Sequence, residues 1–147
     1  MFNLTYTELN NSLFMGGLKH LSQESLPMPV SYNLLKIINA VEAEMKVASS
    51  LYQNILMSHA ELDAQGKLVF KDGVQGQFII PEDKRETFNE KMNEWHKISF
   101  KIERNQLSMN MLTKSTISTQ MLSAVMPVIE DDIGPAESEE ATPVETA

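Results

Sequence analysis

The feature that most constrains the fold is a run of apolar side chains between residues 34 and 62 that alternates spacings of four and three. Its members are Leu34, Ile38, Val41, Met45, Ala48, Tyr52, Ile55, His59 and Leu62. This spacing places them on one helical face, in the pattern of a coiled coil. With Ser31 as N-cap, it predicts a helix over about residues 32 to 62, about 45 Å long. Such a helix requires a partner along its length.

A second helix is predicted over residues 82 to 97. Pro81 is tolerated in a first turn, and acidic residues directly after it favour the positive end of the helix dipole. The apolar stripe of this helix comprises Phe88, Met92 and Trp95. We expect it to lie antiparallel on the distal half of the long helix, near Tyr52, Ile55 and Leu62.

A small β element is predicted around the turn between these helices. Leu68–Phe70 and Phe78–Ile80 flank the polar, glycine-containing segment Asp72–Gly76, which indicates a β-hairpin. Ile98, Phe100 and Ile102 alternate with polar residues and predict a further strand, which we expect to pair with the hairpin. The expected fold class is therefore mainly α with a small β element, α+β, built as a long antiparallel helical hairpin.

Shorter helices are predicted near both ends of the chain. Thr5 and Glu8 have capping-box spacing and predict a helix to about Ser22, weakened in its middle by Gly16–Gly17. Its apolar face comprises Leu9, Leu13, Leu18 and Leu21. The prolines of Leu26–Pro29 predict a stiff connector to the long helix. Ser118 is a candidate N-cap for a last short helix that carries Leu122, Val125 and Met126 and ends at Pro127. Residues 105 to 117 have no clear period.

Charge separates the end of the chain from the rest. The net charge of the 147 residues is −8, and seven of these charges lie at positions 130–147, where there is no Lys or Arg: Glu130, Asp131, Asp132, Glu137, Glu139, Glu140 and Glu145. We expect one helical domain over 1–129 and a disordered acidic tail over 130–147. Because the remainder is nearly neutral, it does not favour nucleic-acid binding.

The sequence offers no catalytic or cofactor-binding motif. The absence of cysteine removes thiolate chemistry, cysteine-based metal sites and disulfides, and His20, His59 and His96 stand too far apart for a metal-ligand spacing. Glu86, Glu90 and Glu94 share a helical face but alternate with basic residues, as expected of a solvated surface. We therefore expect a protein that is not an enzyme and uses no cofactor or metal. The first nine residues lack an export signal, and no stretch is long and apolar enough to span a membrane, so a cytoplasmic protein is expected.

Two groups of residues are candidates for binding a protein partner. The first comprises Leu34, Ile38, Val41 and Met45, which lack an obvious intrachain cover and favour self-association or binding of a partner helix. The competing interpretation is that the first helix folds back over them. The second comprises Met109, Met111, Met121 and Met126, whose flexible thioethers suit either core gaps or adaptable binding surfaces.

Several motifs of this chain resemble a family of small tailed-bacteriophage proteins of unknown function. The motifs are LTYTELN, LPMPVSYNLLKIINAVEAEMK, ISFKIERNQLS and ISTQMLSAVMPVIED, which occur in the same order and span roughly residues 3 to 132. This chain is richer in Met and Ser than the family pattern and continues beyond Asp132. The resemblance implies a viral protein expressed in the cytoplasm of a bacterial host, and it supplies no catalytic residue.

These observations favour a non-enzymatic bacteriophage accessory protein that binds protein in the virion or during virion assembly, with self, phage and host partners left open. The alternative is an early inhibitor of a host enzyme or anti-phage defence system, in which acidic side chains imitate nucleic acid. A phage enzyme with an unrecognised site is a weaker third reading.

Overall fold

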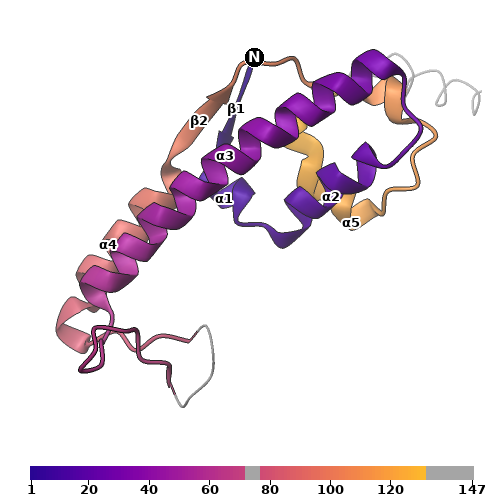
Figure 1. Cartoon of the computed structure of the whole chain (residues 1–147). Coiled ribbons are helices and arrows are strands. Elements are labelled where there is room, and N and C mark those ends of the chain that lie inside the picture. Colours follow the sequence, from indigo (N-terminus) through magenta and orange to yellow (C-terminus); the bar gives the residue numbers. More distant parts are fainter. Residues whose placement is uncertain (72–76, 132–147) are drawn as a thin grey trace, which may run out of the picture. The chain divides into compact units, whose positions relative to one another are not determined.

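The computed structural model describes residues 1–71 and 77–131 of the chain. The chain forms two compact units. The first comprises Met1–Leu4, Glu8–Val41 and the chain from Phe100 onward, and the second comprises Thr5–Thr7 and Glu42–Ser99. The described residues are mainly helical with a small β element, which confirms the expected α+β class (Figure 1). No helix among them is both long and apolar enough to cross a membrane.

The longest interval between successive α-helices of the chain is that between α3 and α4, residues 60–81. The helices are α1 (Tyr6–Leu9), α2 (Ser12–Ser22), α3 (Met28–His59), α4 (Glu82–Lys97) and α5 (Thr119–Val125), with the 3-10 helices η2 (Met109–Leu112) and η3 (Met126–Val128). The strands are β1 (Phe2–Thr5), β2 (Ser99–Ile102), β3 (Leu107–Ser108) and β4 (Ile129–Glu130). Strand β1 pairs with β2, and β3 pairs with β4 in parallel, with Leu107 opposite Ile129.

The single first helix predicted from Thr5 to Ser22 is wrong. Thr5 ends strand β1, and the helical segments α1 and α2 are separated at Asn10–Asn11. The Asn11 side chain accepts a hydrogen bond from the Leu13 amide at 2.9 Å and so caps α2. The predicted capping-box residues Thr5 and Glu8 therefore lie at the short helix α1, which begins directly after Thr5, and not at the start of α2.

The long helix is confirmed as α3, but it begins at Met28 and ends at His59. Pro29 lies within the first turn, where its missing amide hydrogen costs no intrahelical hydrogen bond. Ser31 is therefore inside the helix and not its N-cap. Leu62, the last residue of the predicted apolar face, lies beyond the helix and is exposed.

The β element between α3 and α4 differs from the predicted hairpin. Its loop, Asp72–Gly76, lies outside the described residues. Where the chain is described, the segment contains two isolated antiparallel bridges, Leu62 with Leu68 and Phe70 with Phe78. Phe70 and Phe78 pair directly, as predicted, but farther from the loop Glu61 lies between the two segments: its amide donates to the Ile79 carbonyl and its carbonyl accepts from the Val69 amide.

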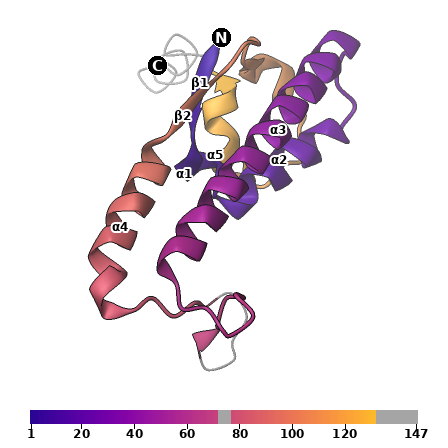
Figure 2. The same ribbon diagram turned by 60° about the vertical axis from the view of Figure 1, so that its left-hand side comes forward.

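Helix α4 is confirmed at its predicted bounds and lies beside the second half of α3 within the second unit (Figures 1 and 2). The strand predicted after it is also confirmed as β2, but its predicted pairing with the hairpin is wrong. Strand β2 pairs with β1, a strand that the sequence analysis did not predict. Leu4 and Ile102 of these two strands are both buried, so the pairing covers apolar surface.

The last helix is confirmed as α5, and its N-cap is the predicted Ser118, whose hydroxyl oxygen accepts a hydrogen bond from the Met121 amide. Residues 105–117, which had no predicted structure, contain β3 and η2. Glu130, assigned by sequence to the acidic tail, forms β4 with Ile129. The tail from Asp132 onward lies outside the described residues.

Gly17 allows α2 and α5 to approach closely within the first unit. A Cβ atom added at Gly17 would lie 2.6 Å from Val125 Cγ1 and 3.2 Å from the Met121 carbonyl oxygen. At the adjacent Gly16 the nearest atom would be Met121 Cε at 3.9 Å, an ordinary contact. The pair that the sequence marks as a weak point of a helix is therefore a packing site at Gly17.

We expect Gly17→Ala to lower the free energy of unfolding by about 1–3 kcal/mol, because the added methyl group overpacks the α2–α5 contact. Gly16→Ala is the matched control, and it should be neutral or stabilising by up to about 1 kcal/mol, the helix-propensity gain of alanine. Urea unfolding followed by circular dichroism measures both. Equal effects of the two substitutions would show that the helices do not approach closely at Gly17.

Candidate functional site

Trp95 fixes helix α4 against the second half of α3. Its side chain is buried, and its Nε1 donates a hydrogen bond to the Ala48 carbonyl oxygen at 3.0 Å. The indole ring also contacts Tyr52, at 5.8 Å between ring centroids, and Tyr6, at 5.2 Å. A tryptophan with its ring packed and its only donor satisfied is a strong structural anchor.

Tyr6 is held in the same unit by a carboxylate. Its hydroxyl donates to Glu44 Oε1 at 2.7 Å. Burial, this hydrogen bond and the negative charge of Glu44 together raise the pKa of Tyr6 to about 12. The phenol therefore stays protonated near neutral pH, and its role is that of a structural donor and not of a general base.

Beside this anchored region, α3 exposes an uncharged surface. Residues 47–60 contain no Asp, Glu, Lys or Arg. Six exposed side chains of this stretch share one side of the helix and form what we call the outer face. Its members are Val47, Ser50, Leu51, Asn54, Met57 and Ser58. Val47, Leu51 and Met57 are 48%, 38% and 39% exposed.

A groove borders the outer face within the second unit. Its volume is about 270 Å³, and its apolar walls include Leu51, Ile55, Trp95 and Ile98. Lys91 and Glu94 line the same groove and form an ion pair at 3.5 Å. The groove therefore combines an apolar floor with a rim that carries both signs of charge, an arrangement typical of protein-binding surfaces.

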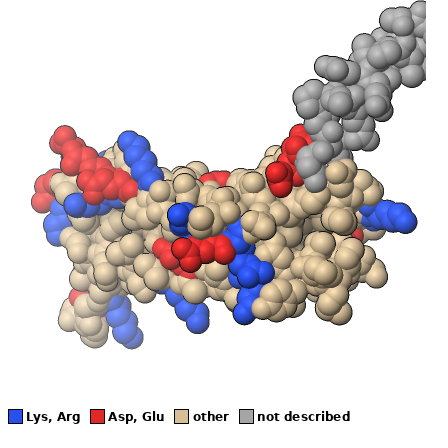
Figure 3. Space-filling model, turned by 90° about the horizontal axis from the view of Figure 1, so that it is seen from above, with Lys and Arg blue, Asp and Glu red and all other residues tan. Residues whose placement is uncertain are grey.

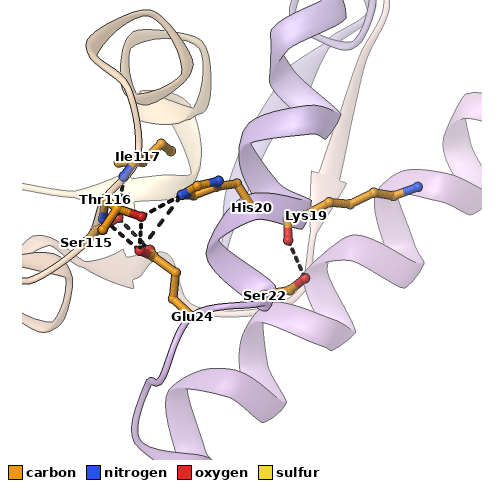
Figure 4. Close-up of polar contacts among 7 residues, drawn as sticks. All are labelled: Lys19, His20, Ser22, Glu24, Ser115, Thr116 and Ile117. Atoms are coloured by element: carbon orange, nitrogen blue, oxygen red, sulfur yellow. Dashed lines mark hydrogen bonds and ion pairs between the residues drawn. The ribbon is translucent and has the colours of Figure 1, made fainter.

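In the first unit, polar side chains gather around Glu24 (Figure 4). The Ser115 hydroxyl donates to Glu24 Oε1 at 2.5 Å, and Thr116 donates to Oε2 from its amide at 2.7 Å and from its hydroxyl at 3.0 Å. His20 Nε2 lies 3.1 Å from the Thr116 hydroxyl oxygen and 3.9 Å from Glu24 Oε2. These contacts tie the end of α2 to the segment before α5.

This cluster is not arranged as a nucleophile with its base. Both hydroxyl groups give their single hydrogen to Glu24, so neither presents a proton to His20. Histidine-activated nucleophiles require the opposite order, in which the hydroxyl donates to the imidazole and the carboxylate orients it. The cluster therefore acts as a clamp that joins two segments of the first unit.

Hydrogen bonding sets the pKa of Glu24. Partial burial alone would raise it, but the Ser115 hydroxyl, the Thr116 amide and hydroxyl, and the nearby His20 outweigh burial and hold the pKa of Glu24 below its ordinary value of 4.5. The ionised carboxylate is thus the form that the folded protein binds more favourably.

Next to the clamp, the first unit has a second groove of about 510 Å³ whose lining includes Pro27, Met111 and Lys114. Met111, one of the predicted partner-binding methionines, is 49% exposed there. Met126 is also exposed, whereas Met109 and Met121 are half-buried, and Met121 lies against Gly17. A binding role for these methionines stays a prediction.

The expectation that Leu34, Ile38 and Val41 lack an intrachain cover is wrong. Leu34 and Val41 are fully buried in the single chain and Ile38 is nearly so, while Met45 is half-buried. The apolar stripe at this half of α3 is part of the first unit's core. In the second half of α3, Val47, Leu51 and Met57 are exposed, and the signal that marks this stretch in the sequence is the absence of charge between Lys46 and Glu61.

The histidines of the described residues have local structural contacts. His59 Nδ1 lies 2.8 Å from the Ile55 carbonyl oxygen, one helical turn away, and its ring contacts Phe88. Across residues 1–71 and 77–131, no group of three or more His, Asp or Glu side chains is placed to hold a metal ion.

Comparison of the chain with protein-family models, curated proteins and solved structures finds no match. The resemblance to small tailed-bacteriophage proteins therefore rests on the sequence motifs alone.

We expect Glu24→Gln to lower the free energy of unfolding at neutral pH by about 1–3 kcal/mol, the usual contribution of hydrogen bonds to a charged group. Because the folded-state pKa lies below the ordinary value, this contribution is present above about pH 4.5 and is lost as the pH falls through the lower folded-state pKa. Denaturant unfolding of both proteins from pH 7 downward measures it. Glu86→Gln, on the exposed surface of α4, is the control. A difference that persists at the lowest pH would contradict the charged clamp.

Proposed function

We propose that this protein is a non-enzymatic bacteriophage accessory protein that acts by protein–protein binding, in the virion or during virion assembly. The resemblance of its motifs supports the viral context. The observation that carries the binding role is the uncharged outer face of α3 beside the groove of the second unit. We take α3, α4 and the segment between them to be the antiparallel helical hairpin that the sequence predicts, with the outer face on its longer arm.

The composition of the outer face supports this role. Charged side chains are depleted in the centres of protein interfaces, whereas methionine and aromatic side chains are enriched there. Exposed helices usually carry both basic and acidic residues, as α4 does. On the face of the molecule shown in Figure 3, basic and acidic side chains are likewise interspersed. A stretch from residue 47 to 60 without one charged side chain departs from that pattern.

The partner that best fits the outer face is a second copy of this chain. In a two-fold symmetric interface each patch meets its own copy, so a charged patch would meet like charge. An uncharged patch avoids this repulsion, and residues 1–129, which carry a net charge of only −1, do not oppose the approach of a second copy. The groove rim is self-complementary in the same sense, because Lys91 of one copy can pair with Glu94 of the other.

The size of the outer face predicts a modest affinity. Residues 47–58 span about 18 Å of helix, which limits the total buried area to about 1,200 Å² or less. Interfaces of this size are typical of transient complexes, and we expect a dissociation constant in the micromolar range.

The alternative, an inhibitor that imitates nucleic acid, is less well supported by the described residues. An acidic mimic requires a surface of one sign, and the acidic residues of α4 are interrupted by basic ones: Lys84, Arg85, Lys91 and Lys97. Mass spectrometry of purified virions separates the two functions, since a virion protein is found there in fixed stoichiometry and an early inhibitor is not.

Sedimentation from low to high micromolar concentration tests the binding surface. The native chain should pass from monomer to dimer, and Leu51→Glu should weaken association by at least about thirtyfold, because an unpaired buried carboxylate costs about 2 kcal/mol or more. Leu35→Glu is the matched control: Leu35 is also an exposed leucine of α3 but lies in the first unit. A native chain that stays monomeric, or a stronger effect at Leu35, would contradict this surface.

Charge exchange at the rim gives an independent check. Lys91→Glu alone should weaken the dimer, because it places like charges opposite each other, and adding Glu94→Lys should restore it. Thermal unfolding of each variant shows whether the monomer is intact. Restoration that fails in folded variants would exclude Lys91 and Glu94 from the interface.

A further inference from the structure

Arg104 lies in a prepared polar site of the first unit that the proposed dimer surface does not use. Its Nε donates a hydrogen bond to Asn33 Oδ1 at 2.8 Å, and Asn33 Nδ2 in turn donates to the Asn105 carbonyl oxygen at 2.9 Å. The guanidinium carbon lies 5.5 Å from the centroid of the Tyr32 ring. The side chain is therefore held at its Nε edge and against an aromatic face, with little rotational freedom left.

The terminal nitrogens of this guanidinium are open to a ligand. Within the described parts of the chain, Arg104 has no ion pair with a carboxylate, and its polar and ring contacts are those with Asn33 and Tyr32. It lines a hollow of about 260 Å³ together with Asn33, Asn105, Glu103 and Met1. A half-buried arginine that is already oriented binds planar oxyanions well, because two parallel N–H groups match the two oxygens of a carboxylate.

A second cation makes the surroundings of Arg104 favourable for negative charge. Lys36 Nζ lies 5.6 Å from the centroid of the same Tyr32 ring. Glu103, which lines the hollow, is the acidic residue nearest in sequence and offsets one of these two positive charges. The net charge of Arg104, Lys36 and Glu103 is therefore positive, and it favours a ligand that carries one or two negative charges.

We propose that Arg104, supported by Asn33, Tyr32 and Lys36, binds a carboxylate of an acidic peptide segment, and that the segment is the acidic end of this same chain. Residues 132–147 carry Asp132, Glu137, Glu139, Glu140 and Glu145 and no basic residue. The Arg104 site is positively charged and residues 132–147 are strongly acidic, so the two are complementary in charge.

The strand pairing places the start of this segment within reach of Arg104. Leu107 of β3 lies opposite Ile129 of β4, Arg104 precedes Leu107 by three residues and Asp131 follows Ile129 by two. Extended-chain dimensions then limit the separation of the Arg104 and Asp131 Cα atoms to about 23 Å. Glu139 and Glu140 follow Asp131 by eight and nine residues, and such lengths of chain span up to about 26–32 Å. Their carboxylates can therefore reach the site, at the high effective concentration of an intramolecular ligand.

Arginine side-chain NMR of the full chain tests this assignment. The sequence contains two arginines, Arg104 and Arg85, so the Nε–H signal of Arg85 on α4 is an internal reference. A variant with Glu137, Glu139, Glu140 and Glu145 all replaced by Gln should shift the Arg104 signal and leave that of Arg85 unchanged. A capped peptide of residues 132–147, added to that variant, should return the Arg104 signal toward its native position.

Substitutions at the site give the specificity controls for the peptide titration. Arg104→Gln, made in the chain with the four Gln replacements, should weaken peptide binding at least about tenfold, as expected when a charge-assisted bidentate pair is lost. Because this variant lacks the Arg104 signal, the titrations of the variants are followed by the side-chain amide signal of Asn33. Lys114→Gln in the same chain removes one positive charge from another part of the first unit and should change binding less than twofold. Equal effects at the two positions would show that the contact is general charge attraction, which overturns the site.

The remaining outcomes decide the source of the carboxylate. If the four Gln replacements leave the Arg104 signal unchanged while the added acidic peptide still shifts it, the carboxylate site stands and its ligand is an acidic segment of another molecule. If neither the replacements nor the peptide moves the signal, Arg104 is not a carboxylate site and the proposal fails. Neither result depends on dimer formation, which sedimentation of Leu51→Glu measures separately.

Discussion

The burial of one stripe along α3 is the constraint on which the rest of the structure depends. A 32-residue helix is stable in water only where other segments cover its apolar side chains. In the first unit this stripe supplies Leu34, Ile37 and Val41, all fully buried. In the second unit Ala48 and Leu56 are buried, and Trp95 of α4 is anchored to the Ala48 carbonyl. Each unit thus forms its core around its own part of the same helix.

Because the apolar stripe of α3 is buried within the chain, the candidate binding surfaces lie on other faces. These two surfaces differ in their chemistry. The outer face of the second unit is uncharged and suits contact with an equally uncharged surface. The Arg104 site of the first unit is polar and suits a carboxylate. The first is expected to depend only weakly on salt, through the Lys91 and Glu94 charges at its rim, and the second is expected to weaken strongly as salt screens its charges. One small chain can therefore carry two associations that respond differently to conditions.

The sequence predicted those elements whose signals are local. Helix α4 begins after a proline and with acidic residues, α5 has Ser118 as its N-cap, and α3 carries an apolar repeat that continues over many turns. All three helices are present in the structure. It failed where a partner distant in sequence decides the structure. Strand β1 exists because β2 pairs with it.

The same distinction explains the candidate sites. Whether an apolar residue such as Val41 is core or surface depends on which segment packs over it, and spacing does not show that. Gly17 is a packing site only because α5 lies against it. The Arg104 site joins residues 33 and 104, which no motif connects. The outer face did have a local signal in the sequence, the long interval without charged residues. The sequence analysis did not use it, because the apolar run of residues 34–62 was the more prominent pattern on the same helix.

The most direct test of this account is an intermolecular measurement on α3. The chain has no cysteine, so Asn54→Cys provides a single attachment point for a spin label on the outer face. The labelled chain is mixed with unlabelled, ¹⁵N-enriched chain, and relaxation of the enriched amides is recorded. The account predicts broadening confined to residues 47–58 and to the groove-lining part of α4, near Lys91 and Trp95. Broadening at Leu34–Val41, or none at concentrations where the chain is dimeric, would contradict it.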